Sequence, residues 1–369
     1  MLAACLAFGW HFLFADEYRL LGEHSAAGAG FISNFVFWKE ANYFDVSATS
    51  KPLLHLWSLG IEEQYYLLWP AVLWIGYRYR LNLLTLTIAG LLASFALNIS
   101  LTASNPTAAF YSPLTRSWEL FVGGLLAFLT IRPPSSFARH EARISHLLDE
   151  IIFAEGGGYA TSHLRVAASL FGLILLVTSI YRIRPESAFP GWWATMPVAG
   201  TSLLIFAGPT TWINRNLLAN PALVWLGLIS YPLYLWHWPL LSFASIIQTK
   251  APTAATGAVI IVASIVLAWL TYTFIELPIR RTSRRPVIAL ALCGAMLCIG
   301  SFGVFIFSND GLRFRFDDRK EFATFFEGLA YDSNSHLEER AQINQNQCNF
   351  YDYASRWPTD VPRENIDKD

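Results

Sequence analysis

Three side chains that can gain or lose a proton, His55, Glu62 and Glu63, lie in an otherwise apolar stretch. The stretch runs over residues 52–70 (PLLHLWSLGIEEQYYLLWP) and stays apolar to about Tyr77, which is long enough to cross a bilayer. An ionised side chain at the centre of a membrane helix costs roughly 2.5–3.5 kcal/mol on insertion scales. These groups must therefore face protein, water or a partner cation.

Helical geometry predicts that this stretch carries one polar stripe, about 80° wide. Its members are His55, Ser58, Glu62, Tyr66 and Trp69. Glu63 falls at the border of the stripe, and Gln64 points to the far side. Two interpretations follow: a structural network in which the carboxylates pair with an arginine of another helix, or a site that needs an acid or base. We favour the second, because a histidine and a carboxylate share the face.

A second polar face is predicted within residues 222–247, which contain SYPLYLWHWPLL. Its members, at helical spacing, are Gly227, Ser230, Tyr234 and His237. A single histidine on an apolar helix is commonly a packing residue, whereas His237 shares its face with a tyrosine and a serine. Both interpretations of His237 stay open at this point.

Arg116 and Glu119 stand three residues apart near the start of another apolar span. They can pair locally, as i,i+3 neighbours do on a helix. Alternatively, Arg116 offers a cation to an acyl carbonyl, to a phosphate or to the carboxylates of residues 62–63. We weigh the structural and functional roles equally.

The string LLHLWSLGIEEQYYLLWP resembles the signature of the acyltransferase family 3 integral-membrane acyltransferases. That family includes O-acetylases of lipopolysaccharide, peptidoglycan and other surface glycans. Further similar strings are SNFVFW (33–38), NYF (42–44), RSWEL (116–120), SYPLYLWHWPLL (230–241) and FIELPIRR (274–281). The resemblance implies transfer of an acyl group, most simply acetyl from acetyl-CoA on the cytoplasmic side, to a hydroxyl of a cell-envelope glycan.

Acyl transfer to a hydroxyl needs a base for its proton and donors for the oxyanion. Glu62 or Glu63 is expected to act as the base or to orient a histidine, and His55 and His237 to donate or accept protons. Arg116 is expected to stabilise developing negative charge. The expected substrate-binding residues are Ser58, Tyr66, Arg116, Glu119, Ser230, Tyr234 and Trp236. No metal is expected, because the sequence has no zinc-type spacing of cysteine and histidine.

The composition indicates a polytopic membrane protein. Of 369 residues, 54% are hydrophobic and 14% charged, against about 25% charged in soluble proteins. The net charge of −1 and the lack of a basic patch argue against nucleic-acid binding. Cys5, Cys293 and Cys298 are expected to be buried in apolar segments, and Cys348 lies in a polar tail.

We predict an all-α transmembrane helix bundle, because lipid admits only helices or closed barrels. The expected crossings are about 1–15, 54–77, 82–101, 114–131, 166–182, 196–209, 222–247, 255–274 and 287–308. The transmembrane domain then covers 1–308 and a polar tail covers 309–369. Residues 16–52 are expected to form a loop. Residues 132–165 are expected to form an amphipathic insert on the membrane surface, with Phe137, Ile144, Leu148 and Ile151 at helical spacing.

The arginines of residues 280–285 mark a cytoplasmic loop by the positive-inside rule. Loops 78–81, 132–165 and 210–221 are then also cytoplasmic, and loop 16–52 and the tail lie outside. The expected location is the bacterial inner membrane, with the bilayer and an envelope polysaccharide or lipid-linked glycan as partners.

By the same resemblance, residues 1–15 correspond to the third helix of the family. Two earlier helices, which carry an arginine and a histidine central to catalysis, would precede it, and a hydrolase-like domain with a GDS motif often follows such a tail. The chain is thus expected to be truncated at its N-terminus and to end within a linker. Two alternatives are a glycan or lipid transporter, since polar stripes also line substrate pathways, and an inactive remnant.

Overall fold

The computed structural model describes residues 1–41, 47–131, 135–152, 163–184, 186–248, 252–282 and 285–316. Every regular element in these ranges is helical, in agreement with the predicted all-α bundle. The chain divides into two units, Met1–Gly311 and Leu312–Asp369. Of the second unit only the start is described, with a short 3₁₀ turn η4 (Arg313–Phe316). The expected tail, including Cys348, otherwise lies outside the described residues.

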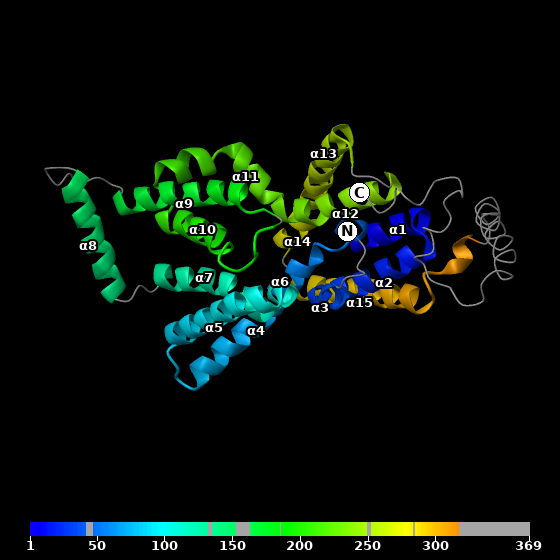
Figure 1. Cartoon of the computed structure of the whole chain (residues 1–369), viewed down its shortest axis with the longest axis horizontal. Coiled ribbons are helices and arrows are strands. Elements are labelled where there is room, and N and C mark those ends of the chain that lie inside the picture. Colours follow the sequence, from blue (N-terminus) through cyan, green and yellow to red (C-terminus); the bar gives the residue numbers. More distant parts are fainter. Residues whose placement is uncertain are drawn as a thin grey trace, which may run out of the picture. The chain divides into compact units, whose positions relative to one another are not determined.

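The expected loop 16–52 is largely helical, so this prediction was wrong. The first elements are α1 (Leu2–Phe12), α2 (Ala15–Ala29), α3 (Ser33–Glu40) and the 3₁₀ turn η1 (Ala48–Ser50) (Figure 1). The start of α2 is stabilised locally, because the Phe14 N–H donates to the Glu17 carboxylate at 2.9 Å. Asp16 and Glu17 also place negative charge in the first turn, where the helix dipole favours it. The polar residues of this region therefore lie mainly on helices, and some of them, such as His24 and Ser25, are buried.

Helix α2 packs against α15 (Arg285–Ser308) through small residues. A Cβ placed on Gly303 would come within 2.6 Å of the Gly22 carbonyl oxygen, and one on Gly22 within 2.8 Å of the Gly303 carbonyl oxygen. Glycine at both positions lets the two backbones touch, which is a common way for membrane helices to associate.

The apolar stretch that contains Glu62 and Glu63 forms α4 (Leu56–Arg78), and His55 lies immediately before its first residue. It is followed by α5 (Leu83–Ser104), the short α6 (Pro106–Tyr111) and α7 (Pro113–Ile131). The Asn82 side chain caps α5 by accepting from the backbone N–H groups of Leu84 and Thr85. Helix α7 packs against both α4 and α5, so it holds the two membrane helices together.

The insert 132–165 contains α8 (Ser135–Ile152), which confirms a helix in that region. The side chains of Leu148 and Ile151 lie outside the described residues. Helix α9 (His163–Arg182) follows and packs against α10 (Thr195–Ala207), where Gly172 and Gly200 face one another.

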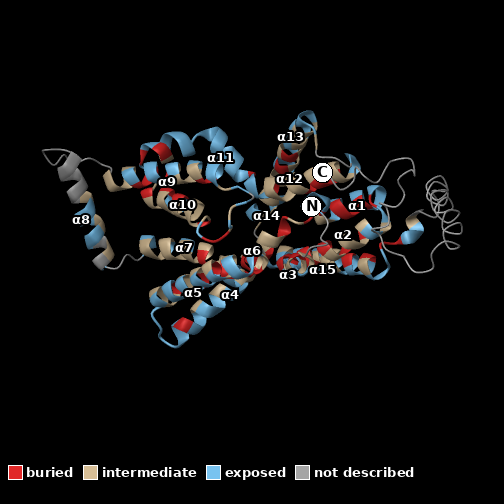
Figure 2. Ribbon diagram, viewed as in Figure 1, coloured by how far each residue is buried: buried red, intermediate tan, exposed pale blue. Residues whose placement is uncertain are grey.

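The C-terminal elements of the first unit carry the second polar face. In order they are the π-helical turn η2 (Ile213–Leu218), α11 (Pro221–Leu228), α12 (Ser230–Gln248), α13 (Ala254–Thr271), the π-helical turn η3 (Tyr272–Glu276) and α14 (Leu277–Arg281). Helix α11 is exposed along its length (Figure 2), whereas α12 packs against α13. Glu276 and Arg280 form an i,i+4 ion pair at 2.6 Å.

Eight of the nine expected crossings coincide with one continuous helical segment each. The expected crossing 222–247 is divided at Ile229 into α11 and α12, so Gly227 does not share a helix with Ser230, Tyr234 and His237, as had been predicted. Five segments are long and apolar enough to span a membrane: Leu83–Ser104, Pro113–Ile131, His163–Arg182, Ala254–Arg281 and Pro286–Ser308. Helices α1 and α10 are apolar but shorter, and at about 1.5 Å per residue neither alone reaches across a hydrocarbon core of about 30 Å. The remaining two are α4 and α12, the helices that carry the polar faces.

The cysteine prediction holds for one residue only. Cys5 is buried, but Cys293 and Cys298 are exposed on α15. Cys293 lines a pocket between α15 and the end of α2, and Cys298 lines a pocket that α1 also borders.

Candidate functional site

His55 lies against α12, beside Tyr234 and His237. The ring centroids of His55 and Tyr234 are 5.2 Å apart, those of His55 and His237 are 6.0 Å apart, and those of Tyr234 and His237 are 5.7 Å apart. His55 is 6% exposed. Neither of its ring nitrogens has a hydrogen-bond partner within the described residues, although the Leu235 backbone lies near the ring. His55, predicted on one polar face, therefore lies against Tyr234 and His237, which were predicted together on another.

The Tyr234 hydroxyl joins the two helices. It donates a short hydrogen bond to the His55 backbone carbonyl. It also lies 2.6 Å from the Ser58 hydroxyl oxygen, and since its own proton is committed to the carbonyl, Ser58 is the donor in that second bond. Ser58 and Tyr234 thus belong to one hydrogen-bonded group with the His55 backbone.

His237 lines a cavity. Its Nδ1 lies 3.2 Å from the Leu233 carbonyl oxygen, so Nδ1 carries the proton and Nε2 keeps a lone pair in the neutral ring. The cavity lies between α12 and α13 and has a volume of about 550 Å³. Its polar lining consists of Ser230, Tyr234, His237 and Ser264, and its other walls are apolar.

Glu62 and Glu63 are half-buried, one to two turns further along α4. No cationic side chain among the described residues lies within ion-pair distance of either, so the structural alternative, pairing with an arginine of another helix, is not formed. They interact electrostatically with each other and with Tyr231, and Glu62 also with Tyr234. Neither makes a hydrogen bond to a histidine in the described structure.

Arg116 pairs with Glu119, which was the local alternative. Its Nη1 lies 3.1 Å from Glu119 Oε1, although the orientation does not meet hydrogen-bond geometry. The guanidinium lies over the rings of Trp57, Phe110 and Phe189, 5.3 to 6.0 Å from their centroids. Because Trp57 follows His55 by two residues, Arg116 contacts the same end of α4 as the histidine pair.

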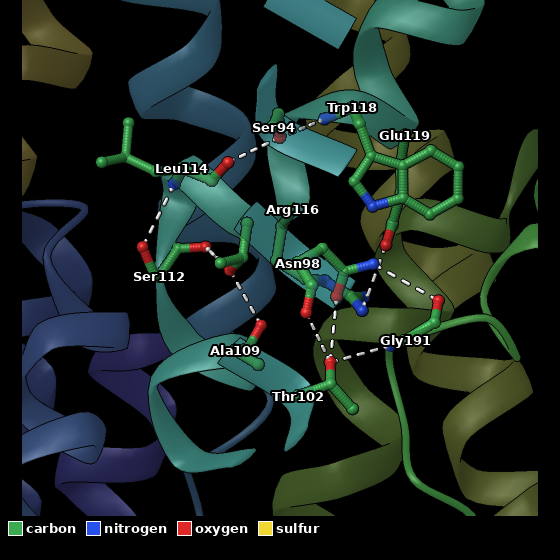
Figure 3. Close-up of polar contacts among 11 residues, drawn as sticks. Ser94, Asn98, Thr102, Ala109, Ser112, Leu114, Arg116, Trp118, Glu119 and Gly191 are labelled. Carbon is green, nitrogen blue, oxygen red and sulfur yellow. Dashed lines mark hydrogen bonds and ion pairs between the residues drawn. The ribbon is translucent and has the colours of Figure 1, made fainter. Parts of the chain in front are cut away.

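A buried hydrogen-bond network fixes the helix that carries Arg116 (Figure 3). On one side, Ser94 of α5 donates to the Leu114 carbonyl at 2.5 Å and accepts from the Trp118 N–H at 2.9 Å. On the other, Asn98 and Thr102 of α5 bond to the backbone of Gly191 at 3.3 and 3.2 Å. Ser94 therefore holds the start of α7 against α5, and Asn98 and Thr102 hold the segment at Gly191 against the same helix.

Three expected binding residues lie apart from this cluster or make structural contacts. Tyr66 is 57% exposed. Trp236 donates to the Thr271 hydroxyl at 2.9 Å, which ties α12 to the end of α13. Ser230 touches the cavity but donates to the Gly227 carbonyl at 2.8 Å. Gln64 points away from the stripe, as predicted, and donates to the Phe31 carbonyl and the Asn34 side chain.

His24, Glu40 and Lys51 form a buried ionic cluster that the sequence pattern did not predict. The Glu40 carboxylate lies 2.7 Å from His24 Nε2 and 2.6 Å from Lys51 Nζ. Burial alone would raise the pKa of Glu40, but the hydrogen bonds and charges of His24 and Lys51 outweigh it, so the pKa lies below its ordinary value. The only sign of this cluster in the sequence is that residues 16–52 contain isolated polar residues. Because their spacing follows neither a helical nor a strand period, it does not predict that they pair.

Within the described residues, no group of three or more histidine, cysteine, aspartate or glutamate side chains is arranged to hold a metal ion. The titratable groups that do come together can exchange protons and form hydrogen bonds. Such an arrangement suits group transfer by general acid–base catalysis.

Comparison with known families agrees with this chemistry. A family model described as an acyltransferase domain matches residues 5–273, which is more than half of the chain. The match includes both helices of the histidine pair, the Arg116 helix and the ionic cluster. No solved structure matches the chain significantly.

Three curated relatives carry O-acetyltransferase names. The putative peptidoglycan O-acetyltransferase YrhL of Bacillus subtilis is 30% identical over 255 residues, covering 67% of this chain and 37% of that protein. The peptidoglycan O-acetyltransferase OatA of Listeria monocytogenes is 27% identical over 259 residues, covering 68% and 39%. The putative O-acetyltransferase SACOL0978 of Staphylococcus aureus is 27% identical over 262 residues, covering 68% and 40%. This chain thus spans about two fifths of the length of these relatives.

Proposed function

Because this chain belongs to the acyltransferase-domain family, we propose that it is a membrane O-acyltransferase that transfers an acetyl group to a hydroxyl of a cell-envelope glycan. The proposed donor is a coenzyme A thioester, most simply acetyl-CoA. The observation that carries the proposal is the meeting of His55, Tyr234 and His237 between α4 and α12.

His237 is the proposed general base. Its Nε2 keeps a lone pair, because Nδ1 donates to Leu233, and the residue lines the cavity. In the transfer, the acceptor oxygen bonds to the thioester carbonyl carbon and its proton passes to Nε2. The carbon–sulfur bond then breaks, and the thiolate takes up a proton as it leaves. A base so placed contributes about 10²–10⁴-fold to the rate of such a reaction.

His55 and Arg116 are the proposed donors to the developing negative charge. The unpartnered ring of His55 has a free N–H in either neutral tautomer, and Arg116 makes no hydrogen bond within the described residues beyond its contact with Glu119. Donor groups that are not already hydrogen-bonded can bind an oxyanion without first breaking another contact. Glu62 and Glu63 are proposed to act on this site through their charge, since they touch neither histidine.

The proposed setting is the bacterial inner membrane, with the glycan outside and the donor supplied from the cytoplasm. The positive-inside distribution of arginines supports this orientation. The His55 end of α4 then lies toward the outside, where the acceptor glycan is. The thioester end of the donor must then extend from the cytoplasmic side as far as the histidine pair.

The test compares the acetate released by mild base from envelope glycan in a deletion host that carries an empty vector, the wild-type chain or a variant. We expect His237→Gln to lower the acetate to the empty-vector value, and Glu62→Gln to lower it in part. The matched control is His11→Gln, which removes an exposed histidine on α1. Membrane abundance of every variant is measured on the same samples.

Wild-type acetate equal to that of the empty vector would refute the transferase. Translocation of a labelled lipid-linked glycan by the same wild-type membranes, without acetylation, would favour the transporter instead. Retention of full acetylation by His237→Gln would leave the transferase standing and reject His237 as its base.

A further inference from the structure

Three side chains of α12, one helical turn apart, hold the residues that lead into α4. Each donates a hydrogen bond to a backbone carbonyl of the Thr49–His55 segment. The pairs are Tyr234 with His55, Trp238 with Lys51 at 2.9 Å, and Ser242 with Thr49 at 2.7 Å. Because i, i+4 and i+8 positions form one stripe of a helix, the segment runs antiparallel along a single face of α12.

The ionic cluster holds the same segment from its other side. Lys51 is 4% exposed and its ammonium bonds to Glu40, at the end of α3, while Glu40 also bonds to His24 of α2. The ring of Phe37 packs against both of these side chains, with its centroid 4.6 Å from that of the His24 ring and 5.7 Å from Lys51 Nζ. Loss of one member of such a group leaves another charge buried and unpaired, so the cluster resists rearrangement.

His55 depends on this anchoring. Its ring makes no hydrogen bond within the described residues, so no side-chain contact of that kind fixes where the imidazole lies. Its backbone is fixed by Tyr234 and by the three residues that separate it from Lys51. A shift of Lys51 is therefore passed directly to the His55 ring and to its 6.0 Å separation from His237.

We propose that Lys51 and Glu40 are positioning residues for the reaction at His55 and His237. They act through the Thr49–His55 segment and touch no substrate. This inference rests on the proposed transferase function. It assigns a role in that function to two residues that lie outside the polar faces of α4 and α12.

The first test measures the rate at which membranes containing the full chain transfer label from radiolabelled acetyl-CoA to envelope glycan. We expect Lys51→Met and Glu40→Gln to reduce the rate about 100-fold, the loss that a misplacement of about 1 Å can cause. Lys51→Arg keeps the charge and is expected to restore most of the rate. The matched control is Lys39→Met, an exposed lysine on α3, with no expected change.

The second test separates positioning from general destabilisation. If Lys51 acts through His55, the double variant Lys51→Met, His55→Gln transfers label as slowly as His55→Gln alone. A further loss in the double variant would show an independent role and overturn the inference. Trp238→Phe removes one hydrogen bond to the same segment without disturbing a charge, and it is expected to lower the rate with little change in membrane abundance.

The outcomes distinguish the two proposals. No transfer by the wild type above the empty host overturns the transferase, and the positioning role with it. Transfer by the wild type, with full rates in the Lys51→Met and Trp238→Phe variants, overturns the positioning role alone. If Lys51→Met does not accumulate in membranes, the rates of Trp238→Phe and Lys51→Arg test the positioning role instead. A full rate in Trp238→Phe would then overturn it.

Discussion

At the scale of single residues, Tyr234 is the group on which most contacts of the site converge. Its hydroxyl bonds to the His55 carbonyl and to Ser58, and its ring packs against both histidines. It therefore fixes α4, α12 and the separation of the imidazoles at once. A tyrosine in a membrane helix that merely filled space would not need its hydroxyl.

The Tyr234→Phe variant tests this role. Each hydrogen bond is worth about 1 kcal/mol net, so the two lost bonds should lower the free energy of unfolding by about 2 kcal/mol. The transfer of acetyl label should fall about 100-fold, because the histidine pair loses its alignment. Thermal unfolding in detergent and the label assay check the two effects. Tyr231→Phe, a half-exposed tyrosine of the same helix, should behave as the wild type.

Glu40 gives the protein a defined pH dependence of stability. Its pKa in the fold is lower than its ordinary value of 4.5, so the ionised form is stabilised in the folded state. The stabilisation is complete above the unfolded pKa and is lost as the pH falls through the folded pKa. We expect the melting temperature in detergent to decline below about pH 4.5, and to decline less in Glu40→Gln. Equal declines in both proteins would contradict this assignment.

At the scale of elements, close helix contact depends on glycines at chosen positions. Gly303 of α15 touches the Gly22 backbone of α2, whereas a Cβ on Gly294 of the same helix would meet nothing within 4 Å. The same substitution at either glycine changes the helical propensity of α15 equally. A difference in stability between the two variants therefore reports on the packing of α15 against α2.

We expect Gly303→Val to destabilise the protein by about 1–3 kcal/mol, because the new side chain must push α2 and α15 apart. Gly294→Val should stay within about 0.5 kcal/mol of the wild type. Thermal unfolding of the detergent-solubilised proteins measures both. A similar loss in the two variants would mean that the close approach of α2 and α15 contributes little.

At the scale of the whole molecule, the orientation in the membrane remains the prediction with the widest consequences. It puts the His55 end of α4 on the acceptor side and the arginine-rich loops on the donor side. In a variant whose native cysteines are replaced by alanine, Ala254→Cys should react with a membrane-impermeant maleimide in intact cells. Asn216→Cys, in the expected cytoplasmic loop 210–221, should react only after permeabilisation. The reverse pattern would invert the topology.

The sequence alone determined the class of protein and most of its helices. Long apolar runs have few alternatives in lipid, because every backbone polar group there needs an internal partner. The polar stripes on α4 and α12 were also visible, since helical periodicity states which side chains share a face. Their spacing placed His55 with Ser58, and Tyr234 with His237.

Only the tertiary structure decided which faces meet and which polar residues pair. It joined His55 to His237, paired Arg116 with Glu119 rather than with the α4 carboxylates, and left Tyr66 exposed. It also built a buried cluster from His24, Glu40 and Lys51 in a region whose composition predicted a loop. Periodicity predicts which side chains share a face of one helix. Contacts between helices depend on packing and on charge pairs between distant residues, and these leave no regular spacing in the sequence.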